Sequence, residues 1–363
     1  MSLWKTDELG KFVTLKRGYD LPQQKRVDGA VPIFSSSGVT GTHKEPMVNA
    51  PGVITGRYGT IGEVFFSKEP FWPLNTTLYV ENFHGNDERF IYYFLKSLKW
   101  EKFTSASAVP GINRNTVHKE IVEIPDLESQ RKIAAVLSTI DDKIDINQRI
   151  NDNLQQQAQA LFKSWFVDFE SAYEHGFVLS EIGAIPKGWR VYKLSEFLPV
   201  ITGKKNANVS SGKGEYPFFS CSQDFSWANE YSFEGNAILV AGNGDFNVKW
   251  YNGKFEAYQR TYVLIPYAER YTSWLYYAVK YNLAKITSAA RGSVIKFITK
   301  GNLENFSFAA PENLERCEVI DTFSSINRTI DGLTQENYRL SALRDTLLSK
   351  LLSGEIDVSN VQL

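Results

Sequence analysis

Two segments of this chain repeat apolar and amide residues at alternating spacings of four and three. The first runs from Ile133 to Trp165 and the second from Val319 to Leu351, each over more than four heptads. Such a pattern predicts long helices that pair as a coiled coil. Pro125 and Pro311 precede the two segments, as expected near a helix start, and Gly354 follows the second.

A heptad seam of this length needs a partner seam of similar length, so we expect the two helices to pair antiparallel with each other. The first helix is predicted over about 129–166. Asn151 and Asn337, at matching positions, are expected to fix the register at a cost in stability. Two alternatives stay open: pairing between two chains, and two amphipathic helices that each pack on their own domain. The predicted seam residues are Ile133, Leu137, Ile140, Ile144, Asn151, Leu154 and Leu161 in the first helix and Val319, Phe323, Ile326, Ile330, Asn337, Leu340 and Leu347 in the second.

Outside these helices, short apolar runs are divided by glycine and proline, which is typical of strands. This predicts two globular regions of mixed α/β (α+β) structure, in which strands predominate. The predicted strands lie at 53–55, 63–66, 77–80, 237–241, 248–251 and 261–265, and the predicted shorter helices at 88–98 and 271–281.

The chain matches itself at a shift of 185 or 186 residues, which indicates an internal duplication. The shift aligns Trp4 with Trp189 near the start of each half and Pro125 with Pro311 before each long helix. We therefore predict two similar halves related by a pseudo-two-fold axis, each a globular region followed by a helix. The predicted boundaries are 1–124 and 188–310 for the globular regions, 125–170 and 311–363 for the helices and the C-terminal tail, and 171–187 for the linker.

Composition places the chain among ordinary globular proteins. Its 363 residues are 43% hydrophobic and 22% charged, enough for two domains with separate cores. No apolar run reaches the roughly 18 residues needed to span a bilayer, and charges within the first 11 residues argue against a secretory signal. Cys221 and Cys317 lie far apart and suit a reducing compartment. We therefore expect a cytoplasmic protein.

The net charge of −1 hides an alternation along the chain. The two globular regions carry +2 and +5, whereas the two helical segments carry −3 and −4. Such asymmetry is compatible with modules that face a polyanion, joined by elements that do not. The values are small, so charge by itself decides nothing.

No catalytic or metal-binding motif is present. The four histidines stand without a matched carboxylate or thiol partner, and no nucleophile elbow or adenosylmethionine loop occurs. The glycine-rich stretch Gly56–Gly62 has no following Lys-Ser/Thr and is predicted to be a hairpin turn, not a phosphate loop. We expect a chain that is not an enzyme and binds no metal.

Basic residues interleaved with aromatic and amide residues recur in loops at matching places of both halves. Arginine and asparagine are the side chains that read guanine and adenine edges, and lysine mostly contacts phosphate. The candidate DNA-binding residues are Lys16, Arg17, Lys25, Arg26, Lys44, Arg57, Tyr58, Arg114, Lys204, Lys205, Asn206, Lys213, Asn243, Arg291 and Lys296.

A set of motifs opens each half and each long helix: Trp4 with Leu9-Gly10, Trp189 with Leu194, Arg57–Gly62, the helix starts Pro125–Ile133 and Pro311–Val319, and Ile140–Ile144. On these residues, and over nearly its whole length, the chain resembles the specificity subunit of type I restriction–modification systems (the HsdS family). The second half departs from the pattern at Gly242–Asp245, which replaces the Arg-Tyr-Gly-Thr turn, and at Arg316–Glu318, which replaces Gln130–Lys132.

The resemblance implies a non-catalytic DNA-binding subunit. Each globular region would be a target recognition domain that reads one half of a bipartite double-stranded DNA site through the major groove, and the helices would be conserved spacers. The implied partners are two methylation subunits and one restriction/translocase subunit, with no membrane partner. The chain itself would hold no cofactor; S-adenosylmethionine, ATP and Mg would be bound by the partners. DNA methylation and restriction would be directed to the site that this chain reads.

One alternative belongs to a different class: a coiled-coil scaffold with two protein- or peptide-binding domains and no DNA role. A neighbouring reading frame with adenosylmethionine motifs would favour the specificity subunit over this scaffold.

Overall fold

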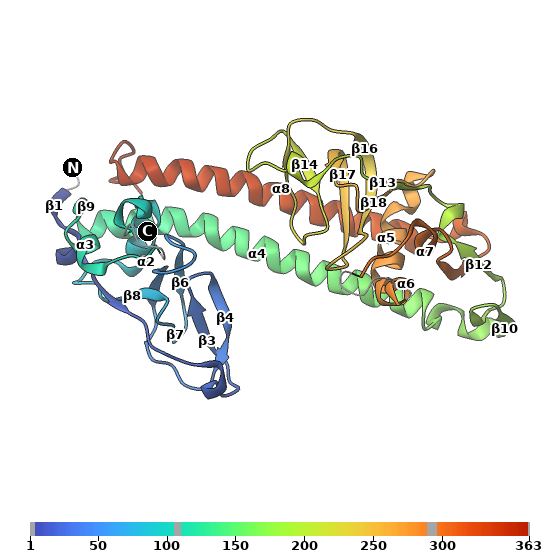
Figure 1. The fold of residues 1–363 in the computed structure, drawn as a ribbon, viewed down its shortest axis with the longest axis horizontal. Helices are drawn as coiled ribbons and strands as arrows, with labels where there is room; N and C mark the ends of the chain where they lie inside the picture. Colours follow the sequence, from blue (N-terminus) through green and yellow to red (C-terminus); the bar gives the residue numbers. More distant parts are fainter. Residues whose placement is uncertain (1–3, 105–109, 289–295, 362–363) are drawn as a thin grey trace. The chain divides into compact units, whose positions relative to one another are not determined.

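The computed structural model describes residues 4–104, 110–288 and 296–361. They form two compact units (Figure 1). The first unit consists of residues 1–146 and 336–363, and the second of residues 147–335.

A four-stranded and a three-stranded β-sheet form the centre of the globular part of the first unit. The larger has the strand order β2–β8–β5–β6 and is antiparallel, and the smaller has the order β4–β3–β7. All five residues of β5 are buried, because β6 and β8 cover its edges and separate apolar clusters cover Val53 and Ile54 on its two faces. The strands are β2 (Thr14–Arg17), β3 (Val31–Ser35), β4 (Gly38–His43), β5 (Gly52–Gly56), β6 (Val64–Ser67), β7 (Trp72–Pro73) and β8 (Thr77–Asn82).

β5 and β6 pair antiparallel on either side of the glycine-rich stretch, which confirms the predicted hairpin. Helix α2 (Glu88–Ser97) follows the sheet. Asp87 caps its N-terminus by accepting a hydrogen bond from the Phe90 amide at 2.8 Å. Phe90 and Tyr93 are fully buried in the core that α2 shares with the sheet.

The second unit contains a six-stranded sheet of order β13–β18–β16–β17–β14–β15. β16 and β17 form a long antiparallel hairpin, and β14 pairs parallel to β17. Helix α5 (Thr272–Tyr281) packs on the sheet and buries every residue from Thr272 to Val279. The strands are β13 (Val200–Thr202), β14 (Tyr216–Phe219), β15 (Ser226–Ala228), β16 (Phe233–Ala241), β17 (Val248–Ala257) and β18 (Thr261–Leu264).

In each unit a two-stranded sheet joins the start of the globular part to its end. Trp4 faces Pro125 across one pair, and Trp189 faces Pro311 across the other, in the same register. The duplication seen in the sequence is therefore a duplication of structure. These strands are β1 (Trp4–Glu8), β9 (Ile121–Pro125), β12 (Trp189–Lys193) and β19 (Ser307–Pro311).

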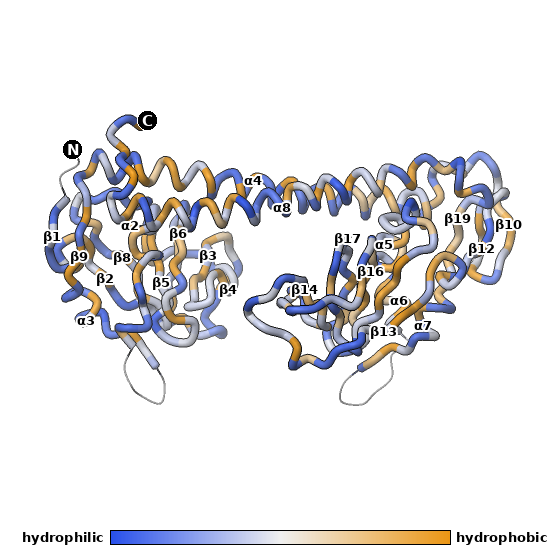
Figure 2. The backbone as a smooth tube through the Cα atoms, turned by 90° about the horizontal axis from the view of Figure 1, so that it is seen from above, coloured by the Kyte–Doolittle hydropathy of each residue, from blue (hydrophilic) through white to orange (hydrophobic). Residues whose placement is uncertain are grey.

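The two predicted long helices are α4 (Leu127–Phe166) and α8 (Val319–Leu352). They pair antiparallel within this chain, which confirms the fold prediction. In the first unit Lys143 forms an ion pair with Glu336 at 3.6 Å, and in the second Asn151 donates to Thr334 at 3.2 Å. Figure 2 shows apolar residues recurring between polar ones along both helices, and every predicted seam residue is buried or half-buried.

The two asparagines predicted to set the register bond to other groups. Asn337 Nδ2 donates to the Ile144 carbonyl at 3.4 Å, and Asn151 Nδ2 bonds to the Thr334 hydroxyl. Each contact joins α4 to α8, so each asparagine ties one helix to the other.

The compact units do not coincide with the sequence repeats. Each repeat ends in one long helix, whereas each compact unit contains one half of α4 and one half of α8. The antiparallel pairing is the reason: Leu348 and Leu351 of α8 return to the first core, where they join Ile133 and Leu137 of α4.

The segment predicted as a linker contains regular structure. The 3₁₀-helix η3 (Glu170–His175) precedes a hairpin of β10 (Phe177–Ser180) and β11 (Gly183–Pro186), and Ile185 is buried. The remaining short helices are α1 (Leu9–Phe12), α3 (Arg114–His118), α6 (Leu283–Thr287), α7 (Lys300–Glu304), η1 (Gln23–Lys25), η2 (Trp100–Phe103), η4 (Leu194–Glu196), η5 (Ala207–Val209), η6 (Glu269–Tyr271) and η7 (Leu314–Arg316).

Among the described residues, no helix combines the length and apolar character needed to cross a membrane.

Candidate nucleic-acid interface

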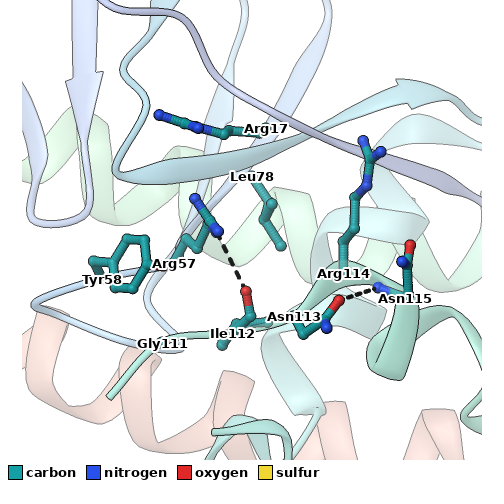
Figure 3. A pocket seen from close by; sticks show the side chains of 9 residues that line it. All are labelled: Arg17, Arg57, Tyr58, Leu78, Gly111, Ile112, Asn113, Arg114 and Asn115. Atoms are coloured by element: carbon teal, nitrogen blue, oxygen red, sulfur yellow. Dashed lines mark hydrogen bonds between the residues drawn. The ribbon is translucent and has the colours of Figure 1, made fainter. Parts of the chain in front are cut away.

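Three arginines from separate parts of the sequence line one cavity of about 460 Å³ in the first unit (Figure 3). Arg17 ends β2, Arg57 follows β5, and Arg114 begins α3. The remaining lining residues are Tyr58, Leu78, Gly111, Ile112, Asn113 and Asn115. No acidic side chain lines this cavity, so the site favours an anion.

The side chain of Arg57 is held in place by its neighbours. Its Nε donates to the Ile112 carbonyl at 3.3 Å, and its guanidinium lies 4.4 Å from the centre of the Tyr58 ring. The backbone is fixed as well, because the Arg57 amide donates to the Thr76 carbonyl and the Ile112 amide donates to the Arg57 carbonyl. A stacked guanidinium with one anchored nitrogen loses little freedom when its other two nitrogens bind a ligand.

Arg17 and Arg114 are exposed and less constrained. Arg17 lies 3.9 Å from Asp20, a contact between two exposed side chains that contributes little to stability. Arg114 follows the capping residue Asn113, whose Oδ1 accepts from the Asn115 amide at 3.0 Å. The cap fixes the direction of α3 and leaves the Arg114 side chain free to reach a ligand.

His118, at the end of α3, ties this helix to β2. Its Nε2 accepts a hydrogen bond from the Leu15 amide at 2.9 Å, so the ring is neutral in this arrangement. Burial lowers the pKa of His118, and the charge of Arg114 lowers it further. The position of α3 beside the cavity therefore depends on a neutral imidazole.

The second unit repeats the backbone of this site. The Ile298 amide donates to the Gly242 carbonyl at 3.0 Å, as the Ile112 amide does to the Arg57 carbonyl at 3.1 Å. An isolated bridge joins Asn243 to Phe297, as another joins Tyr58 to Gly111. The five-residue helix α7 of the second unit occupies the position equivalent to that of α3 in the first unit.

Gly18 and Gly203 occupy equivalent tight places in the two units. A Cβ atom at Gly18 would overlap the Leu74 carbonyl, and one at Gly203 would overlap the Tyr258 carbonyl. Only glycine lets these two loops approach the neighbouring strand so closely. The chain just after Arg17 and just before Lys204 is therefore built in the same way.

The structure brings together only part of the predicted DNA-binding set. Arg17, Arg57, Tyr58 and Arg114 share the cavity. Lys16 is engaged with Glu81, and Lys205 lies 3.3 Å from Glu230. Arg291 lies outside the described residues. The other predicted residues lie on loops and at element ends away from the cavity: Lys25, Arg26, Lys44, Lys204, Asn206, Lys213, Asn243 and Lys296.

Two residues of the cavity, and one equivalent residue in the second unit, were not in the predicted set. Asn113 and Asn115 flank Arg114 in the cavity. Lys300 begins α7 as Arg114 begins α3. The signal for Lys300 was present in the sequence, because the shift of 186 that aligns the prolines also aligns these two cations.

Within the described ranges, no group of three or more histidine, cysteine or carboxylate residues is arranged to hold a metal ion. The arginine-lined cavity can bind an anion or groups that accept hydrogen bonds.

Known proteins share sequence and fold with this chain. A family model described as the type I restriction modification DNA specificity domain matches residues 1–156 and again residues 186–341. The chain is 38% identical over 178 residues to the type I restriction enzyme EcoDI specificity subunit of Escherichia coli, a match that covers 48% of this chain and 40% of that subunit. It is 24% identical to the MjaVIII specificity subunit of Methanocaldococcus jannaschii, over 99% of this chain and 94% of that one.

Among solved structures, the S subunit of a type I restriction–modification system from M. genitalium matches with a TM-score of 0.64 and 17% identity, over 96% of both chains. This likeness supports the fold.

The two family matches fall on the two repeats and together cover most of the chain. They confirm the resemblance seen in the sequence, and nothing in them supports the alternative of a protein-binding scaffold. The chain belongs to the DNA specificity family of type I restriction–modification systems.

Proposed function

We propose that this chain reads a bipartite double-stranded DNA site, with one half-site recognised by each unit through the major groove. One observation carries the proposal: a single backbone scaffold occurs twice in the chain and presents different side chains each time. Two units that share one backbone scaffold but differ in their contact residues suit an asymmetric DNA site with two different halves.

The charge distribution supports a division of labour between DNA and protein contacts. Both globular regions are basic and the first carries the arginine cavity, whereas the segments of the two long helices are acidic. Acidic helices repel the DNA backbone and leave their exposed faces for protein partners. We propose that these partners are two methylation subunits and one restriction/translocase subunit.

The proposed reaction takes place on the partners. The methylation subunits would bind S-adenosylmethionine, and the restriction subunit would bind ATP and Mg, whereas this chain would bind none of them. Because its net charge is only −1, we expect the isolated chain to bind DNA weakly and with strong salt dependence. Tight binding would need the methylation subunits. As a DNA-directed subunit, it would act in the cytoplasm.

The test is to co-express the chain with the methylation subunit encoded beside it and to map adenine methylation across the host genome by single-molecule sequencing. We expect a split motif that is methylated only when this chain is present. Exchanging residues 1–124 for those of a relative with another target should change one half of the motif and leave the other half intact.

The matched control is the same methylation subunit expressed alone. An active methylation subunit whose methylation pattern is the same with and without this chain would contradict the proposed function. A change in both halves of the motif after the exchange would contradict the assignment of one half-site to each unit.

A further inference from the structure

The internal repeat separates two kinds of DNA contact. Both half-sites share the same sugar–phosphate backbone, so a residue that contacts phosphate should be cationic in both units. The bases of an asymmetric site differ between its halves, so a residue that reads a base should differ between the units. Equivalent positions around the arginine cavity can be sorted by this rule.

Arg114 keeps its charge in the second unit, where Lys300 takes its place at the start of α7. Both side chains are exposed at the first residue of a short helix. Lys300 lies 3.2 Å from Glu304, a surface ion pair one helical turn away that a phosphate can displace at little cost. A lysine acts as a point charge, which suits a phosphate contact.

Arg57 does not keep its side chain, because Gly242 stands at the equivalent place. The equivalence rests on the backbone: the Arg57 and Gly242 carbonyls accept from Ile112 and Ile298 at 3.1 and 3.0 Å. The second unit therefore cannot make the contact that Arg57 makes, because a glycine has no side chain. The rule assigns Arg57 to base reading.

The geometry of Arg57 suits one base. Its Nε is bound to the Ile112 carbonyl, and its guanidinium is stacked on Tyr58. Among the described residues, neither terminal nitrogen of Arg57 donates a hydrogen bond. Two free parallel donors on a fixed plane match the O6 and N7 acceptors of guanine in the major groove.

We propose that Arg57 reads a guanine in the half-site bound by the first unit, while Arg114 and Lys300 hold backbone phosphates in the two halves. This assignment rests on the proposed function. It predicts that substitution of Arg57 changes the recognised sequence, whereas substitution of Arg114 or Lys300 changes only the strength of binding.

The experiment uses the complex of this chain with its methylation subunits, carrying Arg57→Ala, Arg57→Gln, Arg114→Ala or Lys300→Ala. Methylation is measured on duplexes in which each base pair of the wild-type motif is replaced in turn. For Arg57→Ala we expect methylation of the wild-type site to fall by roughly 5- to 150-fold, with one guanine position of the first half-site losing its preference. Arg57→Gln should move that position towards adenine, because a glutamine amide pairs with the N6 and N7 of adenine.

The two matched controls, Arg114→Ala and Lys300→Ala, should lower methylation of all duplexes by the same factor and leave the recognised motif unchanged. Each should also lower the slope of log affinity against log salt by about 1, as expected for one lost phosphate contact.

The outcomes separate this assignment from the proposed function. A wild-type complex that methylates no split motif overturns both. A split motif whose first half lacks a guanine, or whose bases stay equally required in both Arg57 variants, overturns the assignment alone. Loss of methylation on every duplex by both Arg57 variants, with unfolding temperatures like that of the wild type, also overturns it.

Discussion

The Arg344 guanidinium of α8 lies 2.9 Å from the Asp141 carboxylate of α4, with both side chains mostly shielded from solvent. The other carboxylate oxygen of Asp141 accepts from the Tyr93 hydroxyl at 2.6 Å. Asp141 thus links the second long helix to helix α2 of the globular part. Burial and the hydrogen bond to Asp141 raise the pKa of Tyr93, so this hydroxyl stays a donor at neutral pH.

The second unit keeps the tyrosine contact without charge. The Tyr277 hydroxyl donates to Asn327 Oδ1 at 2.8 Å, and the position equivalent to Arg344 is Ala158. An amide at the hydrogen-bond acceptor needs no counter-ion, so an alanine suffices where the first unit needs arginine. The second unit therefore keeps the tyrosine hydrogen bond but has no counterpart of the Asp141–Arg344 ion pair.

This comparison predicts the outcome of a double-mutant cycle. Asp141→Ala should destabilise the chain by about 1–3 kcal/mol, because it leaves the Tyr93 hydroxyl and the Arg344 guanidinium short of an acceptor. The double variant Asp141→Asn with Arg344→Ala reproduces the residues of the second unit. It should lose less free energy of unfolding than the sum of the losses caused by Asp141→Asn alone and by Arg344→Ala alone. Urea unfolding of the wild type, of Asp141→Asn, of Arg344→Ala and of the double variant measures the coupling between the two residues. Asp345→Asn, which alters an exposed partner of Arg344, is the control. If the effects of Asp141→Asn and Arg344→Ala simply add, Asp141 and Arg344 are not coupled and the comparison between the units is contradicted.

His118 predicts that stability falls in mild acid. Its folded-state pKa is lowered, so between that pKa and the unfolded value of about 6.5 the unfolded chain binds more protons. The stabilising contribution is complete above pH 6.5 and is lost as the pH falls through the folded-state pKa. Protonation also removes the acceptor for the Leu15 amide and repels Arg114.

The measurement is the unfolding midpoint in urea between pH 8 and pH 5, for the wild type and for His118→Gln. Glutamine retains a hydrogen-bonding side chain but does not titrate. The wild type should lose more stability over this range than the variant, and equal losses would exclude His118 as the titrating group.

Gly18 and Gly203 should resist substitution in the same way. Alanine at either position places a Cβ atom against a backbone carbonyl of a neighbouring strand, so the loop must move. We expect a loss of about 1–3 kcal/mol for each change, by analogy with overpacking. Gly212→Ala, where no atom lies within 4 Å of the new Cβ, is the matched control and should have little effect. Thermal unfolding compares the three variants, and a Gly18→Ala variant as stable as the control would contradict the close approach.

Gly332 predicts a stabilising change. It lies inside α8 on an exposed face, and a Cβ atom there would meet nothing within 4 Å. Alanine should therefore raise stability by about 0.5–1 kcal/mol through reduced freedom of the unfolded chain and higher helix propensity. The unfolding temperature of Gly332→Ala measures the gain, and the methylated motif of the complex should stay as in the wild type. A lower unfolding temperature would show that this helix face is packed.

The secondary structure was predictable where the pattern was long or strongly local. The heptad spacing located α4 and α8 to within about two residues of their observed ends, because a helix seam repeats many times along the sequence. The strands near residues 53, 64 and 77 were also found, but the hairpin of β10 and β11 was not. Its four-residue strands leave Val178 and Leu179 exposed, so they lack the alternation that marks a half-buried strand.

The candidate site was only partly predictable. Each basic loop residue could be identified, but the sequence treated Lys25, Lys44 and Arg57 alike. Which of them converge depends on strand order: β8 lies between β2 and β5, and this brings the ends of β2 and β5 near α3. No local pattern contains that information.

The sequence by itself determined the duplication, the two long helices and the family, because repeats, heptads and motifs are properties of residue order. Only the tertiary structure decided which residues work together. It placed Arg17, Arg57 and Arg114 around one cavity, joined Asp141 to both Tyr93 and Arg344, and returned the end of α8 to the first core. These contacts join residues far apart in the chain, and they arise from strand order and antiparallel helix pairing, which are decided by how separate elements bury their apolar faces together.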